Sequence, residues 1–205
     1  MSVDTLLLNT TPAARSQRLH LGCGRNILPG WINLDARAAP GVDVVADLDA
    51  CAVGALPFDD DSIDEFFGAH VLEHLRRPLP TMQELHRIAR PQARAMFRVP
   101  YGSSDDADED PTHVRRYFPH SFAYFSQPTY HRADYGYRGD WQPVSIKLSV
   151  EGARHAGQSY AQVMEAVRTL RNVVVEMTVE MLAVKPARVA RADLQSGCAV
   201  DLVMI

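Results

Sequence analysis

The first part of the chain is a series of short apolar runs separated by polar residues and by turns that contain glycine or proline. Apolar residues dominate 19–21, 31–34 and 42–46, and the third run is rich in β-branched valine. Runs of this length between turn residues are typical of strands. Residues 63–69 and 93–99 have the same character, and in the second of them apolar and polar positions alternate. The pattern therefore predicts five strands in this part of the chain.

One segment between the last two of these strands has helical periodicity instead. Between 80 and 90, Met82, Leu85 and Ile88 recur at intervals of three residues, which places them on one face of a helix. Pro91 is expected to end this helix, because proline lacks a backbone N–H and clashes with the preceding turn.

The second part of the chain has three further patterned segments and an ambiguous tail. Residues 144–150 and 173–184 read as strands, and residues 151–169 between them have helical spacing. The tail from 186 to 205 ends in the apolar run A-V-D-L-V-M-I. This run either packs on the body of the protein, contacts a partner chain, as in a homodimer, or frays as a terminus.

The turn after the first predicted strand suggests a ligand site. Gly22, Cys23 and Gly24 follow Leu21, and Asp35 stands at the carboxyl end of the second strand. A glycine turn lets a ligand approach the backbone closely, and an acidic residue at the next strand end can accept hydrogen bonds from a ribose diol. Together these features indicate a nucleoside site at the carboxyl edge of a parallel sheet. Taken alone, the G-x-G pattern also fits an ordinary strand-to-loop turn.

The connection between the first two strands is unusually short. Only residues 25–30 separate the glycine turn from the second strand, whereas a parallel crossover normally contains a helix of its own. We therefore expect no helix there, and no helix N-terminus to bind a phosphate. This argues against NAD as the ligand.

Several motifs follow the glycine turn in a fixed order. They are W-I-N-L-D at 31–35, Asp47-Leu48, L-P-F at 56–58 and H-V-L-E-H at 70–74. In this order, and preceded by L-G-C-G, they resemble the class I S-adenosylmethionine-dependent methyltransferases, in particular a small bacterial branch. The resemblance covers residues 19–101. It implies an α/β fold with a Rossmann-like, mostly parallel sheet, an antiparallel C-terminal hairpin and S-adenosylmethionine as cofactor.

The resemblance also implies roles for individual residues of a cofactor site. Asp47 is expected to accept a hydrogen bond from the adenine amino group, and the backbone N–H of Leu48 to meet a ring nitrogen. Asp47 also fits a helix N-cap, and Asp43 and Asp49 compete with it for the same role. His70 is included because it follows the strand at 63–69. The expected cofactor residues are Gly22, Cys23, Gly24, Asp35, Asp47, Leu48 and His70.

The segment 103–143 is too long for a plain connection and is expected to form an inserted substrate-binding lid. It begins with an acidic stretch and is rich in tyrosine, which suits a flat or aromatic small molecule, although many of these rings would pack the lid against the domain. The expected substrate-binding residues are Tyr101, Arg115, Arg116 and Tyr117.

Two histidines are candidates for catalysis. His113 lies in a D-P-x-H motif that recurs in the branch the chain resembles, and its ordinary pKa suits proton transfer. His74 fits either a general base or a capping residue. Asp110, His113, His120 and His131 could instead bind a metal, but their spacing matches no tight ligand motif. We therefore expect no metal site.

Composition narrows the class of protein. Hydrophobic residues make up 46% and charged residues 22% of 205 residues, which suits one soluble globular domain spanning 1–205. The net charge of −4 argues against a nucleic-acid surface. Three cysteines without a C-x-x-C pair, no long apolar run and no signal peptide favour the cytoplasm and exclude a membrane span. Thr11 and Pro12 favour a short lead-in helix that reaches Arg18.

These observations predict a methyltransferase that acts on a small-molecule acceptor by in-line displacement. Possible acceptors include aromatic compounds and secondary metabolites. The alternatives are a methyltransferase of glycan or cell-surface polysaccharide biosynthesis and a non-catalytic S-adenosylmethionine-binding partner subunit. A decarboxylase or cyclase that uses the cofactor's charge, and a dinucleotide-dependent oxidoreductase, are further alternatives. The short connection after the glycine turn counts against the oxidoreductase.

Overall fold

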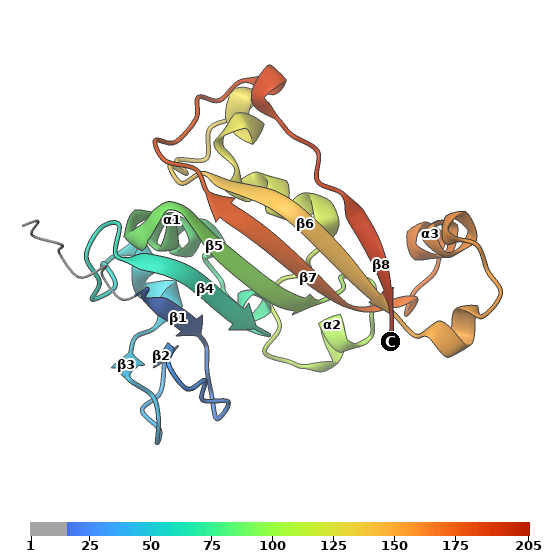
Figure 1. The fold of residues 1–205 in the computed structure, drawn as a ribbon, viewed down its shortest axis with the longest axis horizontal. Helices are drawn as coiled ribbons and strands as arrows, with labels where there is room; N and C mark the ends of the chain where they lie inside the picture. Colours follow the sequence, from blue (N-terminus) through green and yellow to red (C-terminus); the bar gives the residue numbers. More distant parts are fainter. Residues whose placement is uncertain (1–15) are drawn as a thin grey trace, which may run out of the picture.

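The computed structural model describes residues 16–205, whose strands form a single mixed sheet (Figure 1). The start of the expected lead-in helix at Thr11 lies outside the described residues, and its expected end is wrong, because residues 16–17 are not helical and Arg18 begins the first strand. The strands are β1 (Arg18–Leu21), β2 (Ile32–Asp35), β3 (Val44–Val45), β4 (Ile63–Ala69), β5 (Ala89–Pro100), β6 (Trp141–Val150), β7 (Val174–Ala183) and β8 (Val200–Met204).

Helical elements are few and mostly short. The α-helices are α1 (Pro78–Ile88), α2 (Asp106–Glu109) and α3 (Tyr160–Thr169). The 3₁₀ turns are η1 (Leu48–Ala52), η2 (Leu72–His74), η3 (Pro119–Phe125), η4 (Gln127–His131), η5 (Gly152–His155) and η6 (Ala192–Leu194). None of the helices within 16–205 is long and apolar enough to cross a membrane.

The strand order is β3-β2-β1-β4-β5-β7-β6-β8. Strands β1 to β5 run parallel to one another, whereas β7 is antiparallel to both β5 and β6. This arrangement confirms the prediction of a Rossmann-like, mostly parallel sheet with an antiparallel pair near the C-terminus. It also brings the carboxyl ends of β1 to β5 to one edge of the sheet.

The connection from β1 to β2 contains no helix, as its length predicts. The buried side chain of Asn33 organises this loop instead. Its Oδ1 accepts a hydrogen bond from the backbone N of Leu28 at 2.9 Å, and its Nδ2 donates to the Leu28 carbonyl at 3.2 Å. A single side chain therefore replaces a crossover helix as the support of the loop.

Two prolines lie inside strands, contrary to expectation. Pro91 was expected to end a helix at Arg90, but α1 ends at Ile88 and Pro91 belongs to β5. Pro143 was expected to lie in the lid, but it belongs to β6, which already begins at Trp141. The β4–β5 pairing skips residues 90–93, and the β6–β7 pairing shifts register just after Pro143. Proline is tolerated at such bulges because no ladder hydrogen bond is needed there.

The boundaries of the other helices and strands differ less from those predicted. The third strand is only two residues long, and the expected helix over 151–169 is split into η5 and α3. The C-terminal tail is not frayed, because β8 pairs in parallel with β6. The apolar end of the chain therefore packs on the body of the protein, as one of the three readings of the tail predicted.

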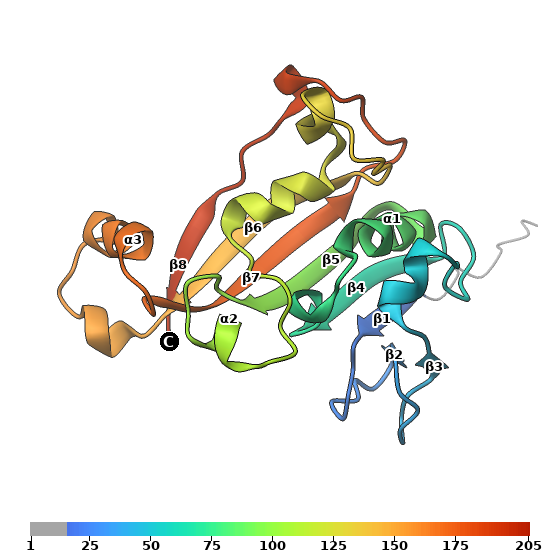
Figure 2. The ribbon, with the colours of Figure 1, turned by 180° about the vertical axis from the view of Figure 1, so that it is seen from behind.

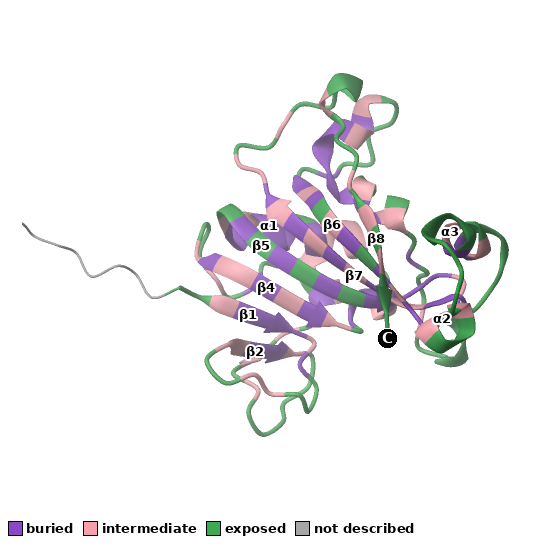
Figure 3. Ribbon diagram, turned by 45° about the vertical axis from the view of Figure 1, so that its right-hand side comes forward, coloured by how far each residue is buried: buried purple, intermediate pink, exposed green. Residues whose placement is uncertain are grey.

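The sheet is covered mainly on one face. Seen from opposite sides, α1, α2 and η3 lie over the same face, and the other face of the sheet carries no helix from the described residues (Figures 1 and 2). Strand β5 shows the difference directly (Figure 3). Ala95 and Phe97 are buried toward the helices, whereas Arg94, Met96 and Arg98 are exposed on the open face.

Candidate functional site

A pocket of about 410 Å³ lies at the carboxyl edge of strands β1 to β4. Such crevices are the usual ligand sites of open α/β sheets, and this volume is within the range of small-molecule sites. The residues that line it are Gly22, Leu34, Asp35, Ala36, Arg37, Ala46, Asp47, Leu48, Asp49, His70, Val71, His74 and Leu75. We call it the edge pocket.

The glycine turn forms one wall of the edge pocket. Gly22 has a φ of +60°, and a Cβ atom there would approach Cγ2 of Val71 to 2.7 Å. Only glycine therefore allows the turn and the Val71 side chain to meet. Cys23 is buried, and its backbone N donates to the Leu34 carbonyl at 3.0 Å. Cys23 and Gly24 support the turn but do not line the pocket.

Asp35 is tied to the glycine turn by its carboxylate. Oδ2 accepts a hydrogen bond from the backbone N of Gly24 at 2.8 Å, and Oδ1 accepts one from the backbone N of Arg37 at 3.0 Å. Each oxygen keeps a free lone pair, because a carboxylate can accept about four hydrogen bonds. The side chain is thus fixed in orientation and remains able to accept from a diol.

Three carboxylates near β3 compete for one predicted role, and their partners separate them. Oδ2 of Asp43 accepts from the backbone N of Asn33 at 2.8 Å, and Asp49 accepts from the backbone N–H groups of 76–77. Oδ1 of Asp47 accepts only from the backbone N of Asp49, at 2.9 Å, as the N-cap of η1. Asp47 is therefore both the cap and a pocket-lining residue with acceptor capacity to spare.

Leu48 follows as the first residue of η1 and is buried at 6% exposure. The first N–H groups of a helix have no partner within the helix. The backbone of Leu48 therefore lies beside Asp47 in the geometry that the sequence predicts for adenine recognition.

His70 adopts a left-handed conformation, with φ of +52°, at the end of β4. Its Nδ1 lies 3.2 Å from Oε1 of Glu73, and its Nε2 lies 3.1 Å from Oε2 of Glu176. The Glu73 carboxylate raises the pKa of His70, burial opposes this effect, and the Glu176 carboxylate adds to it. His70 therefore favours its protonated form more than an ordinary histidine does.

The two histidines predicted to take part in catalysis meet next to the edge pocket. The rings of His74 and His113 have centroids 4.8 Å apart in an edge-to-face arrangement. His74 lines the edge pocket, whereas His113 comes from the lid and its side chain is only 7% exposed. The Thr112 hydroxyl lies 3.0 Å from Nδ1 of His74.

Glu73 is a residue of this site that the sequence reasoning missed. Its side chain is 2% exposed, and neither carboxylate oxygen makes a hydrogen bond within the described part of the chain. The only signal in the sequence was a glutamate between the apolar Leu72 and the candidate His74. Its Oε1 lies 3.2 Å from Nδ1 of His70, whose ring also faces Glu176. A glutamate buried to this extent is rare, so its presence marks a site with a special task.

The lid contributes a second hollow, of about 500 Å³, which we call the lid groove. Its walls are mainly aromatic and come from the start of α1 and from the lid. The lining residues are Pro78, Leu79, Arg115, Arg116, Tyr117, Phe118, His120, Ser121, Tyr124, Phe125, Tyr130 and Tyr135.

Three of the four predicted substrate-binding residues line the lid groove, and the fourth does not. Arg115, Arg116 and Tyr117 line it, whereas Tyr101 packs behind Phe118 with ring centroids 5.4 Å apart. Tyr117 is buried, and its hydroxyl donates to the Leu72 carbonyl at 3.2 Å. Tyr101 and Tyr117 thus help to fix the groove. The exposed arginines already have partners, because Nη2 of Arg115 donates to the Arg76 carbonyl at 2.7 Å and Arg116 pairs with Asp108.

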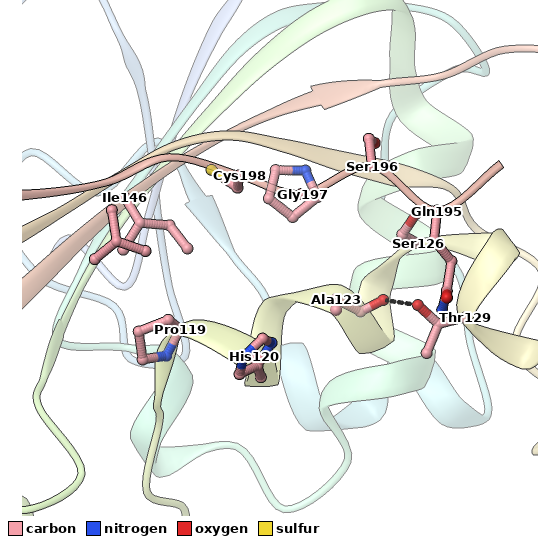
Figure 4. A pocket seen from close by; sticks show the side chains of 12 residues that line it. Pro119, His120, Ala123, Ser126, Thr129, Ile146, Gln195, Ser196, Gly197 and Cys198 are labelled. Carbon is pink, nitrogen blue, oxygen red and sulfur yellow. Dashed lines mark hydrogen bonds between the residues drawn. The ribbon is translucent and has the colours of Figure 1, made fainter. Parts of the chain in front are cut away.

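A third hollow, of about 350 Å³, lies between η3 and the C-terminal segment (Figure 4). Pro119, Ala123 and Ile146 face Cys198 and the neighbouring residues 195–197 across it. None of the predicted site residues lines this hollow. It therefore has no part in the arrangement at the carboxyl edge of the sheet.

Comparison with known proteins agrees with this geometry. Residues 19–97 match a family described as "Methyltransferase domain". No curated protein sequence matches the chain. Among solved structures, a SAM-dependent methyltransferase from Archaeoglobus fulgidus is 15% identical with a TM-score of 0.58, over 82% of this chain and 86% of that one.

Two further structures are similar in fold. A Thermotoga maritima protein described as a possible histamine N-methyltransferase is 11% identical, with a TM-score of 0.52 over 83% of both chains. A complex of the Haloferax volcanii Trm112 methyltransferase activator with a putative methyltransferase matches at 16% identity and a TM-score of 0.50, over 84% of both chains. At these identities the similarity concerns the fold.

Proposed function

From the class I S-adenosylmethionine-dependent methyltransferase domain that this chain carries, we propose that the enzyme methylates a small-molecule acceptor bound in the lid groove. The observation that supports this proposal best is the edge pocket, where Gly22, Asp35, Asp47, Leu48 and His70 come together from four successive strand ends.

The residues of the edge pocket fit S-adenosylmethionine. In the proposed arrangement Asp35 accepts the ribose hydroxyls, and Asp47 with the backbone of Leu48 holds the adenine edge. Gly22 lines the pocket with its backbone and has no side chain of its own to place between the turn and the ligand. No phosphate-binding helix N-terminus stands between β1 and β2, which suits a ligand without phosphate.

The bound cofactor supplies a methyl group on a sulfonium, which is a strong leaving group. The chain's own residues then have to position the acceptor and exclude water. The edge pocket and the lid groove are lined by adjoining parts of one stretch, His70–Leu75 and Pro78–Leu79 respectively. An acceptor in the groove is thereby held next to the cofactor.

The acceptor is proposed to be partly aromatic and to carry an anionic or strongly polar group. Exposed faces of Phe118, Tyr124 and Tyr135 provide stacking surfaces in the groove. Arg115 and Arg116 line the same hollow, and the N–H groups that are not used by the Arg76 carbonyl and Asp108 would bind a carboxylate or phosphate. His74 and His113, the sequence candidates for proton transfer, lie beside the edge pocket, and they take up the acceptor's proton only while their ring nitrogens bind no other ligand.

Two alternatives remain distinct from this proposal. A glycan precursor would also present a phosphate to Arg115 and Arg116, but would use stacking on sugar rather than aromatic faces. A non-catalytic partner subunit would bind the cofactor in the edge pocket and leave the lid groove unused.

The proposal is tested by titrating the purified protein with S-adenosylmethionine, S-adenosylhomocysteine and NAD in parallel. We expect micromolar binding of the two sulfur nucleosides and no binding of NAD. A panel of aromatic acids and sugar phosphates, with transfer of a labelled methyl group as the readout, then identifies the acceptor. Binding of the nucleosides without any transfer, together with a stable complex with another protein, would replace the enzyme proposal by the partner subunit.

A further inference from the structure

A buried carboxylate and two imidazoles meet beside the edge pocket. One ligand-capable atom from each of Glu73, His74 and His113 lies within 4.8 Å of the other two. Glu73 and His74 belong to η2, and His113 belongs to the lid. We propose that these three residues, which we call the η2–lid cluster, bind one divalent transition-metal cation.

The burial of the η2–lid cluster calls for a cation. The side chain of Glu73 is 2% exposed and that of His113 is 7% exposed. Both oxygens of Glu73 and Nδ1 of His113 are buried without a hydrogen-bond partner in residues 16–205. A buried carboxylate without a counter-charge is strongly unfavourable, and so is a buried polar atom without a partner. A bound cation provides the counter-charge for the carboxylate.

His70 accounts for only part of this charge. Its Nδ1 lies 3.2 Å from Oε1 of Glu73, so a protonated His70 forms an ion pair with that oxygen. The same ring also faces Glu176 at 3.1 Å through Nε2. One imidazolium is thus shared between two carboxylates, and within residues 16–205 Oε2 of Glu73 and Nδ1 of His113 are left without a hydrogen-bond partner.

The hydrogen bonds around His74 leave the correct nitrogen free for a metal. The Thr112 hydroxyl donates its single proton to Oδ1 of Asp110 at 2.6 Å. It must therefore accept from Nδ1–H of His74, which lies 3.0 Å away. Nε2 of His74 then carries the lone pair. An outer hydrogen bond of this kind is the usual way in which a metal-binding histidine is oriented.

The distances in the cluster suit a small adjustment around an ion. Nε2 of His113 lies 4.0 Å from Oε1 of Glu73 and 3.9 Å from Oδ2 of Asp110. Ligand atoms on a tetrahedral ion lie roughly 3.4 Å apart when the bonds are about 2.1 Å long. Asp110 is thus within reach as a fourth ligand, and otherwise that position is open to water.

Two imidazoles and a carboxylate favour Zn²⁺ and the neighbouring transition metals over Mg²⁺ or Ca²⁺, which prefer oxygen ligands. Because His113 and Asp110 come from the lid and Glu73 from the body, the cation would also join these two parts of the protein. Metal binding should therefore stabilise the folded state.

The test is direct binding of metal to protein prepared without a histidine tag and stripped with a chelator. We expect calorimetry and elemental analysis to give one Zn²⁺ per chain, with Mn²⁺ weaker and Mg²⁺ not bound at the same concentration. Zn²⁺ should raise the melting temperature. His113→Gln should weaken Zn²⁺ binding at least tenfold, whereas His120→Gln, which changes an exposed lid histidine, should leave it unchanged.

The outcomes separate this inference from the proposed function. Circular dichroism and S-adenosylhomocysteine binding report on the fold and on the edge pocket without involving His113. A folded protein that binds the nucleoside but takes up no Zn²⁺ would overturn the metal site and leave the proposed function standing. Unchanged Zn²⁺ affinity in His113→Gln would also overturn it, and His74→Gln replaces that variant if it fails to fold.

Discussion

At the scale of single residues, aspartate side chains have different roles that depend on their hydrogen-bond partners. Asp43 accepts from the backbone N of Asn33 and does not line the edge pocket, whereas Asp35, Asp47 and Asp49 line the pocket while also supporting the loops around them. A carboxylate that supports a loop is already oriented when a ligand arrives. The hydrogen bonds that support the loop therefore also orient the carboxylate for ligand binding.

Asp35→Ala tests the ribose assignment. Hydrogen bonds to a charged group contribute about 1.5–3 kcal/mol, so the affinity for S-adenosylhomocysteine should fall roughly 10- to 100-fold. Asp59→Ala changes an exposed acidic residue outside the pocket and is the matched control. Isothermal titration measures both variants, and circular dichroism confirms that they are folded. An affinity equal to that of the parent protein would remove Asp35 from the site.

His86 gives the stability of the protein a dependence on pH. Burial lowers the pKa of His86, opposed by the hydrogen bond of its Nε2 to the Val184 carbonyl at 3.0 Å. A histidine whose pKa is lowered by folding binds protons more readily in the unfolded chain. Its contribution to stability is therefore complete above an ordinary histidine pKa of about 6.5 and declines as the pH falls below it.

We expect urea unfolding to show a loss of stability between about pH 7 and pH 5 that is smaller in His86→Gln than in the parent protein. Glutamine keeps a donor for the Val184 carbonyl but does not titrate. His120→Gln, at an exposed histidine, is the control and should behave like the parent. Identical pH profiles for parent and His86→Gln would show that His86 does not contribute.

Some residues of the site can be identified from local sequence features alone. Gly22 and Asp35 could be identified because a glycine turn and the end of a strand are visible in a few consecutive residues. Glu73 could not, because its importance depends on His113, which the lid brings back from a distant part of the chain. No local pattern shows that contact.

At the scale of elements, the strands and their order were largely predictable, and the boundaries were not. The errors at Pro91 and Pro143 have one cause, since both prolines stand where a bulge removes the need for an N–H donor. A bulge depends on the pairing of strands that are far apart in the sequence. Reading one segment alone therefore places the proline outside the strand.

The lid and the C-terminal tail are tied together by one buried ion pair. Asp140 is fully buried just before β6. Arg188 in the tail donates from Nε to its Oδ2 at 2.8 Å and from Nη2 to its Oδ1 at 2.8 Å, and the Arg188 backbone N adds a third bond at 2.9 Å. The backbone N of Gln127 in η4 donates to the same carboxylate at 3.1 Å. Removal of the arginine would leave a buried charge without its partner.

Arg188→Met should lower the free energy of unfolding by about 3 kcal/mol, because breaking one side of a buried pair costs far more than the pair contributes. Arg191→Met is the control: Arg191 pairs with Asp193 at the surface, and its loss should cost less than about 1 kcal/mol. Urea denaturation measures both. Equal effects of the two substitutions would show that Asp140 is not buried in solution as it is in this structure.

At the scale of the whole molecule, the sheet separates two environments. The core lies between the sheet and the elements α1, η1 and η3, and the carboxyl edge holds the edge pocket. The alternation of buried and exposed residues along β5 is typical of a sheet with one open face, since a strand buried on both sides would be apolar throughout. What the sequence did not show is that a largely parallel sheet would leave that face uncovered by the described residues.

The open face has a calorimetric consequence. Because Arg94, Met96 and Arg98 already meet water in the folded protein, unfolding uncovers less new apolar surface than in a sheet packed on both sides. The heat-capacity change of unfolding and its dependence on urea both scale with that newly exposed surface. The stability of this protein should therefore vary less steeply with temperature and with denaturant than its chain length alone would suggest.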